Sequence, residues 1–325
     1  MVEVSSIRQA FNKVYITGIL EEKDIKIEQY EFVNESTGEK FPTNRISGTI
    51  TLDVKGSKIK VSMRANELTK AGAPNGMYAG YKTVMDEYIT RAEALVRGDE
   101  SLASIVKVQG ELNPYDKIDN RTFEVYTPMY IKGNYFNRGT TTEEPKAEFM
   151  TEIFVESVKA EETEGVPTGR TIVEGILPLY RGAVEPVKFV AGEDEKGNVG
   201  KFILENYEAG KTYSVRGDII STITHKDYTR EGMFGTETKT FESVKTEYWL
   251  NSGSSPKPYL VTDPKAYDKN AIKAAMLYRQ EKNDKKIADE RAKASGGYAH
   301  APATATSFDS KIEPLTNEEV EAIEF

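Results

Sequence analysis

Cysteine is absent from this 325-residue sequence, and histidine and tryptophan are nearly absent, with two His and one Trp. The lack of cysteine excludes disulfides, and His225 and His300 alone are too few to build a structural zinc site. No apolar run approaches the roughly 18 residues that a membrane-spanning helix needs. Residues 1–6 have neither the basic nor the apolar region of a signal peptide. These absences predict a cytoplasmic protein without a metal, another cofactor or a membrane segment.

Negative charge exceeds positive charge, and the excess is unevenly distributed. The net charge is −9, of which residues 296–325 carry −5 and residues 264–295 carry +4, which leaves −8 for residues 1–263. A typical nucleic-acid-binding domain is basic, so this balance counts against such a function. Local patches rather than net charge neutralise phosphates, however. Any nucleic-acid site must therefore be a basic patch on an acidic body.

The clearest structural pattern lies in residues 45–64, where apolar and polar residues alternate on both sides of a turn at Lys55-Gly56. A period of two is typical of half-buried strands, so this segment predicts a hairpin with one core face. The other face is nearly all basic on its second strand, which carries Lys58, Lys60 and Arg64. That face is either a binding surface or a solvated edge, because exposed strands often carry lysine to block edge pairing.

The first half of the chain predicts five strands with one helix between the third and the fourth. Residues 23–44, between the first two strands, form either a β-ribbon or a mobile loop. A stripe of tyrosines at helical spacing, which is more typical of core packing than of a cofactor site, ends at Gly98. This element order is that of the OB fold, a small Greek-key barrel. The strands are expected at residues 11–22, 45–64 (two strands), 105–112 and 121–136, and the helix over 78–95.

The second half of the chain repeats this pattern. Tyr213–Ile219 matches Val106–Leu112 position by position, with Gly217 in the place of Gly110. The second unit is shorter by about 20 residues, close to the length of the helix, so it is expected to lack a helix. Its final strand is expected over residues 240–250, which include the only tryptophan, Trp249.

Composition also marks the ends of the folded units. Residues 139–146 resemble a linker, and Thr262-Asp-Pro264 resembles the cap of a charged helix that runs to about residue 294. Beyond it the chain is rich in Gly, Ala, Thr, Ser and Pro, a composition that cannot bury enough apolar surface to fold. We therefore predict OB-like domains at 1–140 and 146–262, a C-terminal helix at 263–295, and a disordered acidic tail at 296–325.

No motif in the sequence predicts an enzyme. Gly197–Lys201 resembles the end of a phosphate-binding loop, but Glu195 stands where its first glycine belongs and Phe202 where its Ser/Thr belongs. His225 follows a strand beside charged residues, which is typical of a solvated side chain. We therefore predict no catalytic residues.

The remaining pattern indicates binding. Proteins that bind single strands without sequence preference combine cations that follow phosphates with aromatic faces on which bases stack. The alternative is that several of these aromatic residues belong to the core or to a domain interface. The candidate residues are Arg45, Lys58, Lys60, Arg64, Tyr126, Tyr130, Lys132, Tyr135, Phe136, Arg138, Arg216, Lys226, Tyr228, Arg230, Phe234 and Trp249. Of these, residues 226–234 are expected to form a loop between the last two strands, the position that OB folds use for binding.

With its OB-type barrels, basic and aromatic face, flexible linker and acidic end, the chain resembles the single-stranded DNA-binding proteins, in their bacteriophage form. The resemblance implies sequence-nonspecific binding to single-stranded DNA in DNA replication, recombination and repair, in a bacterial or phage-infected cytoplasm, and it leaves room for self-association. It also implies that the tail tip recruits replication and recombination proteins. The matching residues are Glu318, Glu319, Glu321, Ile323, Glu324 and Phe325. Glu324 departs from the family, in which proline usually precedes the final Phe.

A second function class fits the same composition. A β-rich structural component of a phage particle, from a tail or a baseplate, would also have alternating strands, no cysteine, many tyrosines and an acidic body. It would have no need of a disordered acidic tail. Salt-sensitive retention on single-stranded DNA distinguishes the two hypotheses.

Overall fold

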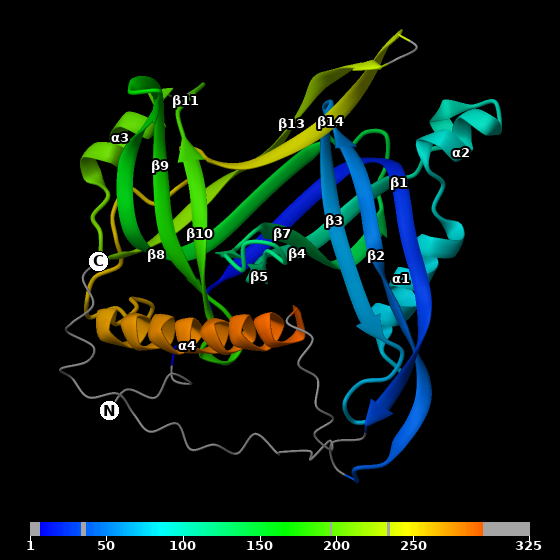
Figure 1. The fold of residues 1–325 in the computed structure, drawn as a ribbon, viewed down its shortest axis with the longest axis horizontal. Helices are drawn as coiled ribbons and strands as arrows, with labels where there is room; N and C mark the ends of the chain where they lie inside the picture. The colour runs from blue at the N-terminus through cyan, green and yellow to red at the C-terminus, as the bar shows by residue number, and fades with distance from the viewer. Residues whose placement is uncertain (1–6, 34–36, 196, 233–234, 295–325) are drawn as a thin grey trace.

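The computed structural model describes residues 7–33, 37–195, 197–232 and 235–294, and for residues 226–242 it describes the backbone alone. Most strands of this part of the chain join one ten-stranded sheet that closes on itself twice (Figure 1). The predicted class, a mainly β protein with two OB-like barrels and a C-terminal helix, is confirmed. The tail predicted at 296–325 lies outside the described residues.

The first barrel closes because its last two strands return to its first and third strands. β1 pairs with both β2 and β4, and β7 pairs with β4 and, in parallel, with β3. This is the strand order of an OB barrel. The segment at 23–44 is a β-ribbon, since β1 and β2 stay paired as far as Val33 and Lys40. The elements are β1 (Asn12–Val33), β2 (Lys40–Val54), β3 (Ser57–Asn66), α1 (Gly76–Glu87), α2 (Arg91–Val96), the short 3₁₀ helix η2 (Glu100–Leu102), β4 (Ile105–Pro114), β5 (Lys117–Ile118), β6 (Val125–Tyr126) and β7 (Met129–Arg138).

The basic hairpin is formed by β2 and β3, and its two faces separate as predicted. Ile50, Leu52 and Ile59 are fully buried, whereas the alternate positions lie on the outer face. The turn residues Lys55 and Gly56 have φ angles of 53° and 87°. Positive φ at both central positions is what a type I′ hairpin turn requires, and its twist matches that of the flanking strands.

The single helix predicted over residues 78–95 is wrong, because the structure has two helices there. Thr90 adopts extended backbone and begins α2 with a capping box: its hydroxyl accepts a hydrogen bond from the Glu93 N–H, and the Glu93 carboxylate accepts one from the Thr90 N–H. An extended residue cannot continue α1. Tyr78 and Tyr81 of α1 are buried against the barrel, which is the core role expected of the tyrosine stripe.

The second barrel repeats the first. β8 pairs with β9 and β13, and β14 pairs with β13 and, in parallel, with β10. The expectation that this unit lacks a helix is wrong: α3 follows β10, and Asn198 caps it by accepting a hydrogen bond from the Lys201 N–H at 2.8 Å. Its elements are β8 (Lys146–Thr163), β9 (Val166–Pro178), the 3₁₀ helix η3 (Tyr180–Gly182), β10 (Val184–Ala191), β11 (Glu193–Asp194), β12 (Gly197–Asn198), α3 (Val199–Asn206), β13 (Thr212–Gly232) and β14 (Gly235–Leu250).

The glycines that repeat in the sequence occupy equivalent places where strands cross closely. A Cβ atom on Gly110 would lie 2.2 Å from the carbonyl oxygen of Lys132, and one on Gly217 would lie 1.9 Å from that of Trp249. Gly48 is equally constrained, at 2.1 Å from the carbonyl oxygen of Asp24. These distances are far below van der Waals contact, so only glycine lets the backbones approach this closely.

The two barrels share a strand. Residues 12–17 of β1 pair with β8, and Val14–Thr17 pair with β4 on the other side as well. The buried residues of both barrels consequently form one cluster, in which Val14, Ile16 and Phe149 lie at the junction. Residues 139–145, where the sequence predicts a linker, connect β7 to β8.

Cleavage of this connection tests the predicted domain boundary. Limited proteolysis within residues 139–145 is expected to yield fragments ending near 140 and beginning near 146, as seen on a denaturing gel. The fragments should stay together in native size exclusion, because β1 and β8 remain paired and apolar surface stays buried. Fragments that separate without denaturant would show that the shared strand contributes little, and resistance at 139–145 would contradict the boundary.

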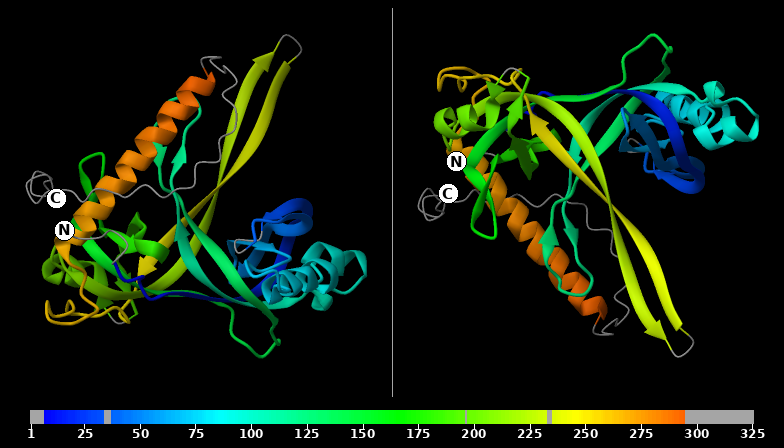
Figure 2. Two further views of the ribbon diagram at one scale, coloured as in Figure 1. Left: turned by 90° about the horizontal axis from the view of Figure 1, so that it is seen from below. Right: turned by 90° about the horizontal axis from the view of Figure 1, so that it is seen from above.

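The hairpin of β13 and β14 projects far from the second barrel (Figures 1 and 2). Its strands stay paired from Gly217–Leu250 out to Gly232–Gly235. The loop predicted at 226–234 is therefore wrong over most of its length, since residues 226–232 belong to β13. Residues 226–231 are mostly polar and contain no glycine or proline, so the sequence has no strong turn signal before Gly232.

The C-terminal helix α4 (Lys269–Ala294) begins five residues after Pro264, the predicted first position of the helix. Asp268 provides the cap, because its carboxylate accepts a hydrogen bond from the Ala271 N–H at 2.8 Å. Ile272 and Ala275 of α4 are buried with Phe154 and Ile176 of the second barrel. Figure 2 shows the helix running from that barrel to the β5–β6 hairpin of the first.

Candidate nucleic-acid interface

The outer face of β3 and β7 combines cations with aromatic rings. Ser62 of β3 pairs with Lys132 of β7, next to the buried pair of Val61 and Ile131. Because side chains alternate along a strand, the neighbours of these buried residues share the outer face. The outward residues are Lys60, Ser62 and Arg64 on β3, and Tyr130 and Lys132 on β7.

Tyr115, Lys117 and Tyr130 form what we call the tyrosine platform. The rings of Tyr115 and Tyr130 are stacked, with centroids 4.8 Å apart and planes inclined by 20°. The Lys117 ammonium donates a hydrogen bond to the Tyr130 hydroxyl at 2.5 Å and lies 4.9 Å from the centroid of that ring. Tyr115 is 40% exposed, so the platform offers an aromatic surface to solvent. Such surfaces stack nucleobases of any sequence.

The platform is also electrostatically suited to an anion. The hydrogen bond to Tyr130 outweighs desolvation and raises the pKa of Lys117 above its ordinary value. Burial alone would raise the pKa of Tyr130, but the hydrogen bonds from Lys117 and Tyr115 outweigh it and leave that pKa below its ordinary value. Lys117 is therefore fully protonated at neutral pH, and a positive charge stays beside the stacked rings.

The predicted cations of the basic strand differ in what they already contact. Lys60 and Arg64 are exposed, and neither lies within ion-pair distance of a carboxylate among the described residues, although the charge of Arg64 acts on Glu28. Lys132 is paired with Glu111 at 2.8 Å. Lys58 is held by Glu21 at 2.5 Å and by Asp53 at 3.5 Å, two carboxylates that also bind Arg91. Lys60 and Arg64 are thus the cations of this strand that are most available to phosphates.

The other predicted residues of the first barrel lie around this face in different settings. Arg45 stacks on Tyr30, 3.7 Å from its ring centroid, along the β1–β2 ribbon. Tyr126 and Tyr135 are 50% and 62% exposed. Phe136 packs edge-to-face on buried Tyr81 at 5.5 Å, which is the core role that the sequence left open.

Arg138 is turned away from the platform toward α1. Its guanidinium lies 4.6 Å from the ring centroid of Tyr88 and donates a hydrogen bond to the Glu87 carbonyl at 3.1 Å. These contacts tie the end of β7 to the end of α1.

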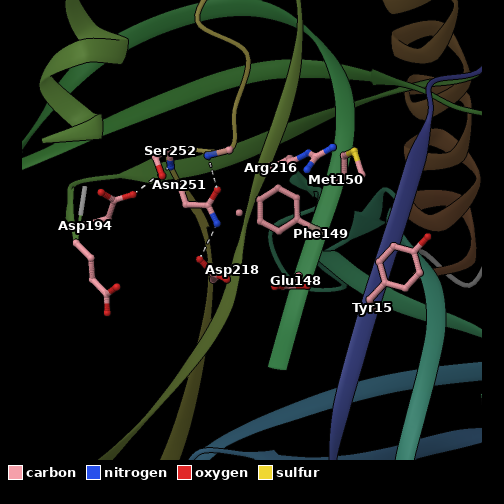
Figure 3. Close-up of a pocket in the computed structure, with 12 residues that line it drawn as sticks. Tyr15, Glu148, Phe149, Met150, Asp194, Arg216, Asp218, Asn251 and Ser252 are labelled. Carbon is pink, nitrogen blue, oxygen red and sulfur yellow. Dashed lines mark hydrogen bonds between the residues drawn. The ribbon is translucent and has the colours of Figure 1, made fainter. Parts of the chain in front are cut away.

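Arg216, which the sequence groups with the DNA-binding residues, lines a pocket of about 540 Å³ at the junction of the barrels (Figure 3). Tyr15 of the shared strand lines it from the side of the first barrel. The carboxylates that line the pocket outnumber this one arginine, so the electric field inside the pocket repels a phosphate. They belong to Glu148, Asp194, Glu195 and Asp218.

The remaining predicted residues belong to β13, β14 and the tail. Trp249 lies beneath the guanidinium of Arg170, at 5.0 Å from the centroid of the Trp249 ring. The same guanidinium forms an ion pair with Glu247 at 2.6 Å. Lys226, Tyr228 and Arg230 lie in the projecting arm of β13, where the structure describes only the backbone. Phe234 and the tail residues Glu318, Glu319, Glu321, Ile323, Glu324 and Phe325 lie outside the described residues.

Sequence reasoning missed two members of the platform, Tyr115 and Lys117. They fall between the strands expected at 105–112 and 121–136, in a stretch without clear periodicity. The alternation of Tyr115, Asp116 and Lys117 was the available signal, since it places an aromatic ring and a cation on one side of an extended segment.

The described residues hold no group of three or more His, Asp or Glu side chains arranged to bind a metal ion. None of their helices combines the length and apolar character needed to cross a membrane.

Comparison with known proteins places the chain in a family. The model of the YorF family matches residues 10–289. The chain belongs to the YorF family. No curated protein matches this YorF member. Solved structures that match the chain include a deletion mutant of the single-stranded DNA binding protein from Thermus aquaticus, at 10% identity and a TM-score of 0.44, covering 80% of this chain and all of that one. The wild-type Thermus aquaticus protein matches at 10% identity and a TM-score of 0.42, covering 79% of this chain and 97% of that one.

A more distant match is a replication protein A heterotrimer bound to single-stranded DNA. It has 9% identity and a TM-score of 0.21, and the match covers 76% of the YorF chain and 52% of the other. The OB-like character of the two barrels rests on their own strand pairings.

Proposed function

We propose that this protein binds single-stranded DNA without sequence preference, through the outer face of β3 and β7. The observation that carries the proposal is the tyrosine platform beside exposed Lys60 and Arg64. Stacked rings offer a surface to bases, and the cations neutralise the phosphates between them. Every base has a flat face, so a site built on stacking tolerates any sequence.

The position of the face within the barrel supports the same proposal. OB folds bind oligonucleotides on the second and third strands and with the loops that join the first strand to the second and the fourth to the fifth. β3 is the third strand of the first barrel, and Tyr115 and Lys117 lie at the start of the connection from β4 to β7. Among the described residues, no feature favours the alternative of a structural virion component.

The finer part of the proposal concerns the tail. We infer from the resemblance of the acidic tip, Glu318 to Phe325, to that of single-stranded DNA-binding proteins that it recruits proteins of replication, recombination or repair. A tethered acidic segment also competes for the basic face, since tethering can hold it at roughly millimolar effective concentration. Deleting residues 310–325 should then leave DNA affinity unchanged or raise it at low salt.

The binding face is tested by the salt dependence of affinity. Fluorescence anisotropy with two unrelated single strands and a duplex should show equal affinity for the strands and weaker affinity for the duplex. Replacing Lys60 and Arg64 together with alanine should reduce the slope of log affinity against log salt by roughly 0.7 for each lost phosphate contact. Lys58→Ala is the matched control, because Lys58 is already neutralised by Glu21 and Asp53.

Two results would contradict the proposed face. An unchanged slope in the folded double variant would show that β3 is merely a solvated strand. A larger loss for Lys58→Ala than for the double variant would place the phosphates at the turn end of β3 and not along Lys60 and Arg64.

A further inference from the structure

The connection from β4 to β7, residues 115–128, carries much of the proposed site but has little structure of its own. Its only strands are β5 and β6, which pair through two residues each. Tyr115 and Lys117 of the platform lie at its start, and Tyr126 lies near its end. The β4–β7 ladder ends at Pro114 and Met129, so Tyr115 and Lys117 lie just beyond the paired backbone, where a side-chain attachment can fix them.

Asp116 supplies that attachment. It stands between Tyr115 and Lys117, so its side chain leaves the segment on the side opposite the platform. The side chain is only 5% exposed. Its carboxylate accepts hydrogen bonds from the Arg279 guanidinium and the Asn283 amide of α4. It also accepts one from the Thr127 hydroxyl, at 2.7 Å, which joins the two ends of the connection.

Arg279 fixes this attachment to the second barrel. Its Nη2 donates to the Thr127 hydroxyl at 2.9 Å, and its Nε donates to Glu185 of β10 at 2.8 Å. The planar fork of arginine can hold several acceptors at once in this way. One side chain of α4 thereby contacts the connection of the first barrel and a strand of the second.

The charges of this cluster identify Asp116 as the main counterion of Arg279. The pKa of Glu185 is raised to about 7, mainly by burial and secondly by the charge of Asp116. Burial alone would raise the pKa of Asp116, but the hydrogen bonds from Asn283, Thr127 and Arg279 outweigh this effect and lower that pKa. At neutral pH, Asp116 is therefore fully ionised, whereas Glu185 is partly protonated.

A second contact of α4 supports the same arrangement. Arg291 lies 5.4 Å from the ring centroid of Phe123, at the turn between β5 and β6. Figure 2 shows this hairpin lying beside the C-terminal half of α4. The helix thus follows the whole connection and holds it at both its base and its tip.

We propose that Arg279 and Asn283 are positioning residues for single-stranded DNA binding: through Asp116 they hold Tyr115 and Lys117 against Tyr130, although neither residue touches DNA. This inference rests on the proposed function. It makes α4 part of the binding apparatus of the first barrel, although the helix packs mainly on the second. Because α4 leads directly into the acidic tail, it also links the tail to the binding face.

The test measures two quantities for each variant: the affinity for a single strand, and the slope of log affinity against log salt concentration. Arg279→Ala should weaken binding to a single strand about 3- to 10-fold with an unchanged salt slope, because no phosphate contact is lost. Lys282→Ala, which removes an exposed charge from the same helix, is the matched control and should have little effect. Asp116→Asn gives the sharpest result: it removes a negative charge near the site, so electrostatics alone would tighten binding, whereas loss of positioning weakens it.

A double-mutant cycle gives independent support. Arg279→Ala combined with Tyr115→Ala should be clearly less than additive, since both act on one platform, whereas Arg279→Ala with Lys60→Ala should be additive. If Arg279→Ala unfolds the protein in circular dichroism, Asn283→Ala replaces it, since it removes one hydrogen bond and no charge.

The outcomes separate the two proposals. Normal affinity in Arg279→Ala, with reduced affinity in Tyr115→Ala, would overturn the positioning role and leave the proposed face intact. A reduced salt slope in Arg279→Ala would show that Arg279 contacts phosphate, which also overturns positioning. Normal affinity in both Tyr115→Ala and Tyr130→Ala would overturn the proposed face itself.

Discussion

Replacing Tyr130 with alanine is expected to weaken the binding of single-stranded DNA by roughly 10- to 100-fold, because base stacking on an aromatic ring contributes about 1–3 kcal/mol per base. The loss should lie toward the upper end of this range, since Tyr130 also supports Tyr115 and accepts the hydrogen bond of Lys117. The measurement is the equilibrium dissociation constant at a fixed salt concentration, by anisotropy with a mixed-sequence strand.

Tyr130→Phe separates stacking from hydrogen bonding. It keeps the ring and removes the hydroxyl, so affinity should fall much less than in Tyr130→Ala. Tyr180→Ala is the matched control, because Tyr180 is 68% exposed on η3 of the second barrel and is not part of the platform. Equal affinity for the wild type and a folded Tyr130→Ala variant would rule out the platform as a stacking surface.

Gly217→Ala is expected to cause the largest loss of stability of any single methyl addition in the barrels. The new Cβ would lie 1.9 Å from the carbonyl oxygen of Trp249 and 2.7 Å from the ring of Phe149. Both neighbours are fixed, one as backbone in a strand pair and the other as a buried ring at the barrel junction. Overpacking of a rigid site typically costs up to about 3 kcal/mol, and this contact lies at or beyond that limit.

The free energy of unfolding in urea measures this effect. Gly80→Ala in α1 is the matched control: the same methyl group meets no atom within 4 Å, and alanine favours a helix over glycine. The control should be as stable as the wild type or more stable by about 1 kcal/mol. A Gly217→Ala variant with wild-type stability would show that β13 and β14 can separate at this point without cost.

The sequence alone was sufficient to predict those features that depend on residues close to one another in the chain. The alternation in residues 45–64 predicted which side chains of β2 and β3 are buried, because a strand turns every second side chain to the same face. The repeated glycines predicted two similar barrels, because a close crossing of strands excludes a Cβ at that one position. The Tyr78 and Tyr81 stripe predicted a helix packed on the core for the same local reason.

Local patterns failed where a short polar signal competed with them. The capping box of Thr90 and Glu93 divided the expected helix, and Asp268 rather than Thr262 or Asp263 began α4. The second unit was expected to lack a helix because it is shorter than the first, but a difference in length does not show which element is missing. The short helix α3 is therefore present although the unit is shorter.

The tertiary structure decided which of the predicted cations and rings form a site. Lys58 and Lys60 are equivalent in the alternating pattern, but Glu21 of β1 and Asp53 of β2 neutralise Lys58, whereas Lys60 stays exposed. Tyr115 comes close to Tyr130 because β4 and β7 pair next to it, and Asp116 contacts Arg279, which lies 163 residues further along the chain. Ion pairs and stacked rings form between segments that are distant in the chain, so they depend on how the barrels close, whereas the period of a strand depends only on its own backbone.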